Sequence, residues 1–418
     1  MLRVAKVIVA IAGFSIAFLG LLAGVWYIIP PFVSGGEIDL SRATMGASLV
    51  ALSLGLGLPL AWQGLSSLRG RPSRLFRPRP AWVLVPLFTV AVILGQAVLT
   101  LDLLPALTFP PFYVLAAVLP PLFFLAFVGR KLAESGIRWR EVVLQLASGA
   151  FLATFGAFGL EAVFGLLAMV VVLVLAALMP GGDAWVQELS AYLQDPRLFQ
   201  GTENLYGPLP SLPILIILGL IVLVIGPMVE EMFKSLGVVM MSYRRPGKAQ
   251  AFFWGLTGGA GFALAEALVN GASSLEGWVG VATMRVGATA MHCLGGGLMG
   301  LGWYYLFATR RPWRLLGAYA ASVSLHALWN VTASAMLVVS LSATSPATEE
   351  IGLALGGLVI LGLMAFLSLL ALSAIFAIFS LTRWLQTQML SARSSSPHSR
   401  PLPPILVGRE SQFPLSQL

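Results

Sequence analysis

The stretch Gly226-Pro-Met-Val-Glu-Glu-Met-Phe-Lys-Ser-Leu236 carries three charged residues inside an apolar run from about Leu212 to Met241. A run of this length is typical of a membrane-spanning helix. Each charge at the centre of such a helix costs roughly 2.5–3.5 kcal/mol. Glu230 and Lys234 are four residues apart and can pair, whereas Glu231 points about 100° away and is expected to have no partner in its own helix. Two acids beside one lysine favour a functional site over a salt bridge that only packs helices.

The composition places this stretch in a protein that lies largely within a membrane. The chain has 418 residues, of which 58% are hydrophobic and 10% are charged, and its mean hydropathy is +0.90. Recurring apolar runs predict an all-α, polytopic bundle of transmembrane helices. The net charge of +8 would suggest nucleic-acid binding in a soluble protein, but the basic residues here lie in loops, so we expect no nucleic-acid partner. The single cysteine, Cys293, excludes an intrachain disulfide framework.

The apolar runs predict about ten spans with both termini in the cytoplasm. They fall at about 7–30, 44–65, 81–104, 111–129, 146–179, 211–242, 250–272, 281–308, 315–340 and 351–382. The first run continues past Tyr27, which is too long for a signal peptide, so it is predicted to be an uncleaved span. Lys and Arg gather in every second loop, and the alternate loops are acidic or neutral, with Arg42 and Arg197 as the exceptions. This alternation follows the positive-inside rule.

Four regions follow from this pattern. Residues 1–210 form an N-terminal five-span region that ends in an outer loop, 180–210, which either lies partly on the membrane surface or is a solvated connector. Residues 211–345 form a four-span core of catalytic type, and residues 346–390 form a C-terminal span. The Ser- and Pro-rich segment 391–418 is predicted to be a disordered tail.

The core concentrates the polar residues that lie at membrane depth. Glu266 lies in the run 250–272, Arg285 and His292 lie in the next run, and His326-Ala-Leu-Trp-Asn330 lies in the one after. Histidine and carboxylate side chains can bind a divalent metal that keeps an open position for water. Alternatively, a glutamate can act as general base on water while His and Asn stabilise the oxyanion. Either chemistry hydrolyses an amide bond, and the motifs H-E-x-x-H, G-x-S-x-G and paired Asp are absent.

Glycines are dense in the same two runs that carry Glu266 and His292. They are Gly255, Gly258, Gly259, Gly261, Gly295, Gly296, Gly297, Gly300 and Gly302. Small residues let transmembrane helices approach closely. We therefore expect close packing that brings side chains from different helices together.

The order of these motifs resembles the PrsW family of intramembrane proteases. The chain has Glu230-Glu231-x-x-Lys234, Phe262-x-x-x-Glu266, then Arg285 and His292, then His326-x-x-x-Asn330, over about residues 215–335. More distantly it resembles CAAX-prenyl-protease and bacteriocin-processing membrane proteins, which carry F-x-x-x-H where this chain has Glu266. One departure is Ala267, where many relatives have Asn. The resemblance implies a prokaryotic plasma-membrane endopeptidase that cuts membrane-anchored proteins, such as an anti-sigma factor.

Roles are assigned to eight residues on this basis. The catalytic set is Glu230, Glu231, Glu266, His292 and His326, and the orienting or oxyanion-stabilising set is Lys234, Arg285 and Asn330. Glu231 is favoured as the general base, with Glu266 as the alternative. If the site holds a metal, the expected ligands are His292, His326 and Glu266, a set that suits zinc.

Two other function classes compete with the protease. Buried Glu, His and Lys side chains also build proton relays in ion-coupled transporters. Transporters often place interrupted helices in both halves of the chain, whereas the polar residues here lie in one half. A non-catalytic membrane scaffold that keeps these residues for packing is the third possibility. A protein substrate anchored in the membrane and the membrane lipids are the expected partners.

Overall fold

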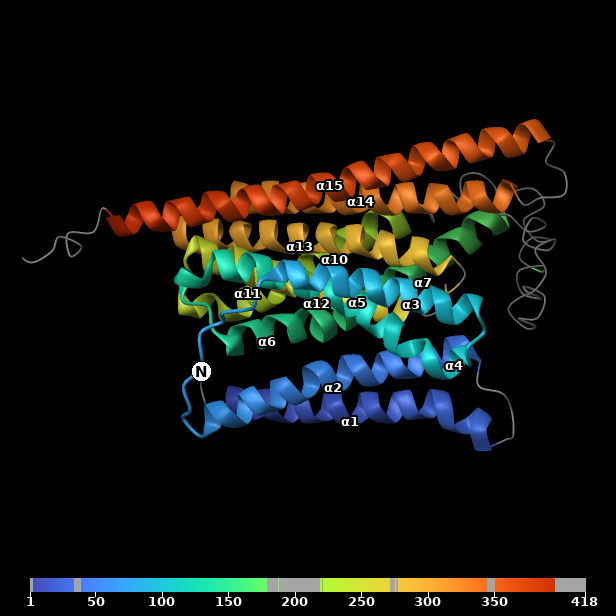
Figure 1. Ribbon diagram of the computed structural model, residues 1–418. Helices are drawn as coiled ribbons and strands as arrows, with labels where there is room; N and C mark the ends of the chain where they lie inside the picture. Colours follow the sequence, from blue (N-terminus) through green and yellow to red (C-terminus); the bar gives the residue numbers. More distant parts are fainter. Residues whose placement is uncertain are drawn as a thin grey trace, which may run out of the picture.

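The computed structural model describes residues 3–33, 39–178, 221–270, 277–343 and 350–394, and the single residues 187, 219 and 275. Within these residues the chain is helical and has no strand, only an isolated bridge between Leu75 and Arg138. The long helices run in roughly one direction and form a bundle (Figure 1). The all-α class predicted from the apolar runs is therefore confirmed.

The N-terminal part of the bundle contains seven α-helices. They are α1 (Arg3–Val33), α2 (Leu40–Leu68), α3 (Leu84–Thr100), α4 (Pro105–Thr108), α5 (Pro110–Lys131), α6 (Trp139–Ala147) and α7 (Thr154–Leu178). A π-helical segment, η3 (Ser148–Ala153), joins α6 to α7. The fifth predicted span is therefore one continuous helical run that begins earlier than expected, and the π turns inside it add a local bulge.

The C-terminal part carries the predicted site. It contains the π-helical segment η6 (Ile221–Ile225), α10 (Gly226–Lys234), α11 (Leu236–Met241), α12 (Lys248–Asn270), α13 (Trp278–Thr309), α14 (Pro312–Ala343) and α15 (Glu350–Ser394). Short 3-10 turns lie at Ala81–Val83, Ala133–Ser135 and Ser242–Arg244. Helix α15 continues to Ser394, beyond the expected start of the tail at residue 391. The predicted outer loop, apart from residue 187, and the rest of the tail lie outside the described residues.

Eight helical runs in the described residues are long and apolar enough to cross a membrane. They are Arg3–Ile29, Leu40–Leu68, Ala81–Thr100, Pro105–Lys131, Trp139–Leu175, Lys248–Val269, Pro312–Ser340 and Ala354–Ser391. Two predicted spans are not among them. The run 211–242 lies only partly within the described residues, and α13, although 32 residues long, is not in the set of eight. The chain is a multi-pass membrane protein, and the count of ten spans stays a prediction.

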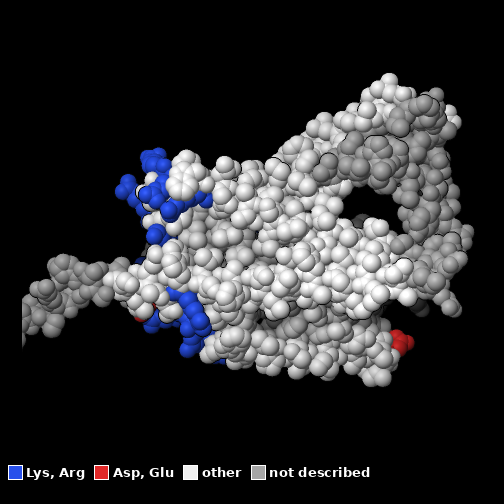
Figure 2. All heavy atoms as spheres, turned by 90° about the horizontal axis from the view of Figure 1, so that it is seen from above, with Lys and Arg blue, Asp and Glu red and all other residues white. Residues whose placement is uncertain are grey.

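The charge distribution fits a defined orientation in the membrane. Figure 2 shows that the Lys and Arg side chains gather at one end of the molecule. The start of α1 and the end of α15 both lie at that end (Figure 1). Because basic residues are enriched on the cytoplasmic side, this arrangement agrees with cytoplasmic termini, which stay a prediction.

Helix α12 is the centre of the bundle. Of the residues in its most apolar stretch 89% are buried inside the protein, against 22% for α1 and 11% for α15. Its glycines bring its backbone against that of α13. A Cβ at Gly259 would meet the carbonyl of His292, and one at Gly255 would meet the carbonyl of Gly296. The glycine-rich runs therefore pack as expected, backbone against backbone.

The N-terminal helices support the helices that carry the site. The hydroxyl of Tyr113 on α5 donates a hydrogen bond to the carbonyl of Ala267 on α12, at 2.5 Å. The indole Nε1 of Trp278, at the start of α13, donates to the carbonyl of Val92 on α3, at 3.0 Å. Aromatic packing among Phe109, Tyr113 and Trp278 surrounds these contacts. The first part of the chain thus fixes the ends of α12 and α13.

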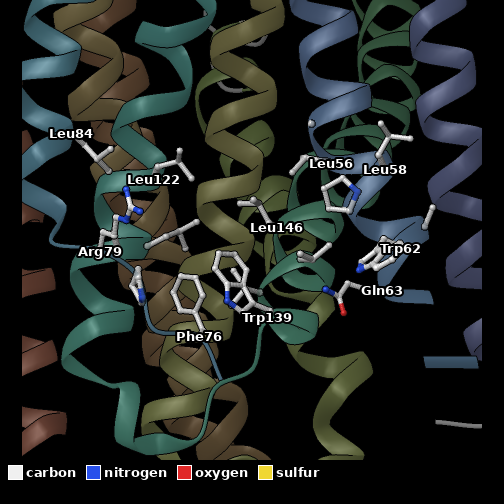
Figure 3. A pocket seen from close by; sticks show the side chains of 18 of the residues that line it. Leu56, Leu58, Trp62, Gln63, Phe76, Arg79, Leu84, Leu122, Trp139 and Leu146 are labelled. Carbon is white, nitrogen blue, oxygen red and sulfur yellow. The ribbon is translucent and has the colours of Figure 1, made fainter. Parts of the chain in front are cut away.

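A cavity of about 1100 Å³ lies between α2, α3, α5 and α6. Figure 3 shows Trp62 on α2, Leu122 on α5 and Trp139 on α6 around it. Its lining is almost entirely apolar, with Gln63 and Arg79 as the main polar side chains among the described residues. A second cavity, of about 700 Å³, lies on another side of α2, against α1, α6 and α11.

Candidate active site

Helix α10 presents its charged residues to the centre of the core. It begins with Gly226-Pro227 and ends at Lys234, where Ser235 separates it from α11. The Nζ of Lys234 lies 3.0 Å from Oε2 of Glu230 and 2.8 Å from Oε1 of Glu231. The side chains of Lys234 and Glu231 are fully buried, and that of Glu230 is 17% exposed.

The expectation that Glu231 has no partner in its own helix is wrong. Residues three apart on a helix are also neighbours, so the long lysine side chain reaches Glu231 as well as Glu230. One ammonium group thus bridges both carboxylates. This compensates much of the charge that would otherwise be buried alone.

The two histidines enter the same cluster from α13 and α14. The rings of His292 and His326 are perpendicular, at 89°, with their centres 4.9 Å apart. The Nζ of Lys234 lies 2.8 Å from Nδ1 of His292 and 3.3 Å from Nδ1 of His326. The Nδ1 of His326 also lies 3.0 Å from Oε1 of Glu231. Both rings are nearly fully buried.

Glu266 and Arg285 hold the other side of His292. The Nε2 of His292 lies 2.8 Å from Oε2 of Glu266. The Nη1 of Arg285 lies 3.0 Å from Oε1 of the same carboxylate. The side chains of Glu266 and Arg285 are 28% and 25% exposed, against 2% for His292. Five predicted catalytic residues therefore lie in one cluster, and their individual roles stay predictions.

The hydrogen bonds assign a proton position to each imidazole. An ammonium group has three donors and no acceptor, so Nδ1 of His292 must accept, and its Nε2–H donates to Glu266. The three closest partners of Lys234 use its three donors, which leaves the more distant Nδ1 of His326 free to donate to Glu231. The Nε2 of His326 lies 3.6 Å from Oε2 of Glu230.

Three of these side chains fit a divalent metal. Glu230, His292 and His326 each offer a ligand atom, and these atoms lie within 4.8 Å of one another. Metal binding requires ring nitrogens without a proton, which would be Nδ1 of His292 and Nε2 of His326. The ammonium of Lys234 contacts two of these atoms, Oε2 of Glu230 and Nδ1 of His292. Glu266, the carboxylate expected in this set, instead contacts the opposite nitrogen of His292.

Two residues beside the cluster received no role from the sequence. The ring of Phe262 lies 4.2 Å from Nζ of Lys234 and 5.3 Å from the ring of His292. A Cβ at Gly295 would lie 2.6 Å from Oε2 of Glu231. Two features of the sequence could have indicated that these residues lie at the site. Phe262 precedes Glu266 by four residues, and α13 is rich in glycine.

Helix α10 is anchored to its neighbours by polar contacts. The hydroxyl of Tyr319 on α14 donates to the carbonyl of Met228, at 2.8 Å. The indole of Trp303 on α13 donates to the hydroxyl of Ser235, at 2.8 Å. Asn330, predicted to stabilise an oxyanion, is half-buried and has no hydrogen-bond partner among the described residues.

Comparison with protein families identifies the core. Residues 213–370 match the family model described as PrsW family intramembrane metalloprotease. This segment includes all eight predicted site residues, so the resemblance inferred from the motifs is confirmed over these residues. No curated protein and no solved structure matches the chain. The family match supports an intramembrane protease, which implies a membrane protein as substrate.

Proposed function

We propose that this chain is a metal-dependent intramembrane endopeptidase that hydrolyses a peptide bond in a membrane-anchored protein. The match of residues 213–370 supports the enzyme class. The observation that carries the mechanism is the group of Glu230, His292 and His326, with ligand atoms within 4.8 Å of one another beside the buried carboxylate of Glu231. The family resemblance favours the plasma membrane of a prokaryote and an anti-sigma-factor-like substrate.

The residues that would hold the metal are Glu230, His292 through Nδ1 and His326 through Nε2, with zinc as the proposed ion. When bound by these residues, zinc would supply a more acidic water and an electrophile for the scissile carbonyl. Lys234 would move away from this position, because its ammonium now contacts the same atoms. It would keep its contact with Glu231 and so continue to compensate that charge.

Glu231 is the proposed general base. Its Oε1 is held by Lys234 and His326, whereas its Oε2 is buried and has no hydrogen-bond partner among the described residues. A carboxylate oxygen with a free lone pair can accept a proton from water during attack on the peptide carbonyl. The two contacts at Oε1 fix the direction in which Oε2 points.

Glu266 and Arg285 are proposed as positioning residues. Glu266 accepts the Nε2–H of His292, which keeps Nδ1 directed towards Lys234, and Arg285 orients the carboxylate. Partners of this kind fix the tautomer and the orientation of a metal-binding histidine. Asn330, one turn after His326, keeps its proposed role at the oxyanion.

A metal-independent glutamate mechanism is the second candidate. The observation in its favour is that the ammonium of Lys234 already contacts Glu230, Glu231 and His292, so a cationic group lies beside these side chains without an ion. In this mechanism Glu231 activates water, and the histidines stabilise the developing oxyanion.

Reconstitution in liposomes separates these candidates. The full chain is incubated with a panel of single-span substrate proteins, before and after exhaustive chelation, and cleavage sites are mapped by mass spectrometry. We expect cleavage that is lost on chelation and restored by Zn²⁺. Cleavage that survives chelation in metal-free protein would contradict the metal mechanism and favour the glutamate mechanism. No cleavage of any substrate, in zinc-loaded and folded protein, would contradict the protease assignment itself.

A further inference from the structure

The cavity of about 700 Å³ lies between the N-terminal hairpin, formed by α1 and α2, and the helices packed against it. Helices α1 and α2 form one wall, and α6, η3 and α11 form the other. Its volume lies within the range of natural ligand sites. Most of its lining belongs to residues 5–152, outside the segment that matches the protease family.

One end of the cavity is strongly basic. Among the described residues its lining includes five basic side chains and no acidic one: Lys6, Arg71, Arg138, Arg140 and Arg244. Arg244 is paired with Glu141, at 2.8 Å, and Lys6 donates to the carbonyl of Ser67. Arg71 and Arg138 are exposed and have no ion-pair partner in the described part of the chain.

The rest of the lining is mostly apolar, with a few polar side chains among the apolar ones. Ile8, Ala12 and Ile16 on α1 face Leu60 on α2 and Leu144 on α6. Between these surfaces, Gln145 is 1% exposed, and its Oε1 has no hydrogen-bond partner among the described residues. The Nε of Arg140 and the hydroxyl of Ser148, both in the lining, are also buried without a partner there. None of these three atoms is accessible at the surface of the cavity, so its basic end is the polar part that a ligand can contact.

We propose that this cavity binds an anionic phospholipid of the surrounding membrane. Arg71, Arg138 and Arg140 would hold the phosphate of the headgroup, and the apolar walls of α1 and α2 would contact an acyl chain. The basic end lies on the side of the bundle where Lys and Arg gather (Figure 2), which is the side predicted to be cytoplasmic. Basic pockets between transmembrane helices on that side are suited to anionic headgroups.

The position of the cavity connects lipid binding to the proposed active site. Gly237 and Met241 of α11 contribute to its wall, and α11 follows directly after α10, which carries Glu230, Glu231 and Lys234. A lipid in this position contacts both the N-terminal hairpin and the segment that continues from the catalytic helix. It would therefore stabilise the attachment of α1 and α2 to the core.

The test is native mass spectrometry of the full chain with phosphatidylglycerol or phosphatidylcholine of equal chain length. We expect phosphatidylglycerol to bind and phosphatidylcholine to bind much more weakly. The double variant R71Q/R138Q should bind phosphatidylglycerol about tenfold more weakly or worse, because each basic residue near the surface contributes measurably to anionic lipid binding. The matched control is R74Q/R77Q, which removes two exposed charges from the loop that holds Arg71 but outside the cavity.

A second variant tests the apolar part without changing charge. Ala12→Phe fills the wall beside α2 and should also weaken phosphatidylglycerol binding. The proposal is wrong if the control pair weakens binding as much as R71Q/R138Q, or if both lipids bind equally. It is also wrong if inorganic phosphate displaces the lipid at millimolar concentration, since the site would then recognise a free anion.

Discussion

The Oε2 atom of Glu231, which accepts no hydrogen bond among the described residues, faces Gly295 of α13. A Cβ at Gly295 would lie 2.6 Å from this oxygen. Helix α13 therefore forms the wall against which the carboxylate rests, and it does so only because this position has no side chain. The same carboxylate is fully buried and held at its other oxygen by Lys234 and His326. Its orientation is thus fixed from three sides.

The first prediction concerns Glu231 itself. Glu231→Gln keeps the shape of the side chain but removes the carboxylate that would accept the proton from water. We expect cleavage of a membrane-anchored substrate to fall about 10²–10⁴-fold, the usual contribution of general acid–base catalysis. Single-turnover cleavage in liposomes measures this loss.

The matched control is Glu141→Gln on α6. Glu141 is also a buried carboxylate in an ion pair, with Arg244, but it lies outside the cluster. This variant should keep its cleavage rate. If Glu231→Gln cleaves normally, the base assignment moves to Glu266, and normal cleavage by Glu266→Gln as well would contradict the hydrolase.

The second prediction concerns Gly295. In Gly295→Ala the new methyl group would push the carboxylate of Glu231 aside, so we expect a reduced turnover rate. Thermal stability should change little, because Ala favours a helix over Gly by about 1 kcal/mol and offsets part of the clash. Cleavage kinetics and a thermal melt of the same preparation give both quantities.

Gly297→Ala is the control for this variant. A Cβ at Gly297 would lie 2.7 Å from the ring of Phe252, so it creates a similar clash without contacting an acid. If both variants lose turnover equally, the effect of Gly295→Ala is general repacking of α13 and not displacement of the base.

The third prediction concerns two effects of Lys234: it compensates the buried carboxylates, and it competes with a metal for Glu230 and His292. Breaking a buried ion pair by removing one partner costs about 3–5 kcal/mol, so Lys234→Ala should be less stable than the natural chain in metal-free buffer. It should also gain more stability from added Zn²⁺ than the natural chain does, because its own ammonium no longer competes for Glu230 and His292. Thermal melts with and without Zn²⁺ measure the difference.

Lys234→Arg restores the positive charge and should recover part of the metal-free stability. Full activity and unchanged stability in Lys234→Ala would show that the bridge between Glu230 and Glu231 has no role. Equal stabilisation of both chains by Zn²⁺ would show that the ammonium and the metal do not share a position.

The fourth prediction concerns the support of His292. Glu266→Ala removes the acceptor of its Nε2–H, and losing such a partner costs about 10–100-fold in metal affinity. Arg285→Gln should have a smaller effect, about fivefold or less, because its ion pair is partly exposed. Competition with a coloured chelator measures the affinity of each variant. If Glu266→Ala binds zinc normally, Glu266 does not position this histidine.

The sequence was sufficient to predict the helical class and the membership of the cluster. Charges at membrane depth must face one another and not lipid, so Glu230, Glu266, His292 and His326 on consecutive helices were expected to meet. All four residues lie within the segment 213–370 that matches the family model.

The sequence could not predict which atoms meet. The pairing of Glu266 with Nε2 of His292, and of Lys234 with Nδ1, depends on the depth and rotation of α12 and α13, which their glycine contacts set. Those contacts are between backbones, and motif spacing along one helix carries no information about them. The same reason explains why Gly295 received no role.

The direct contact between the backbones of α12 and α13 also decides how a polypeptide reaches the cluster. Because the carbonyl of His292 already touches Gly259, an extended chain has no room to pass between these two helices. Of the three acids in the cluster, Glu230 and Glu266 have exposed surface, at 17% and 28%, whereas Glu231 has none. In the proposed mechanism, a substrate segment would therefore reach the cluster from the exposed side of these carboxylates and not between α12 and α13.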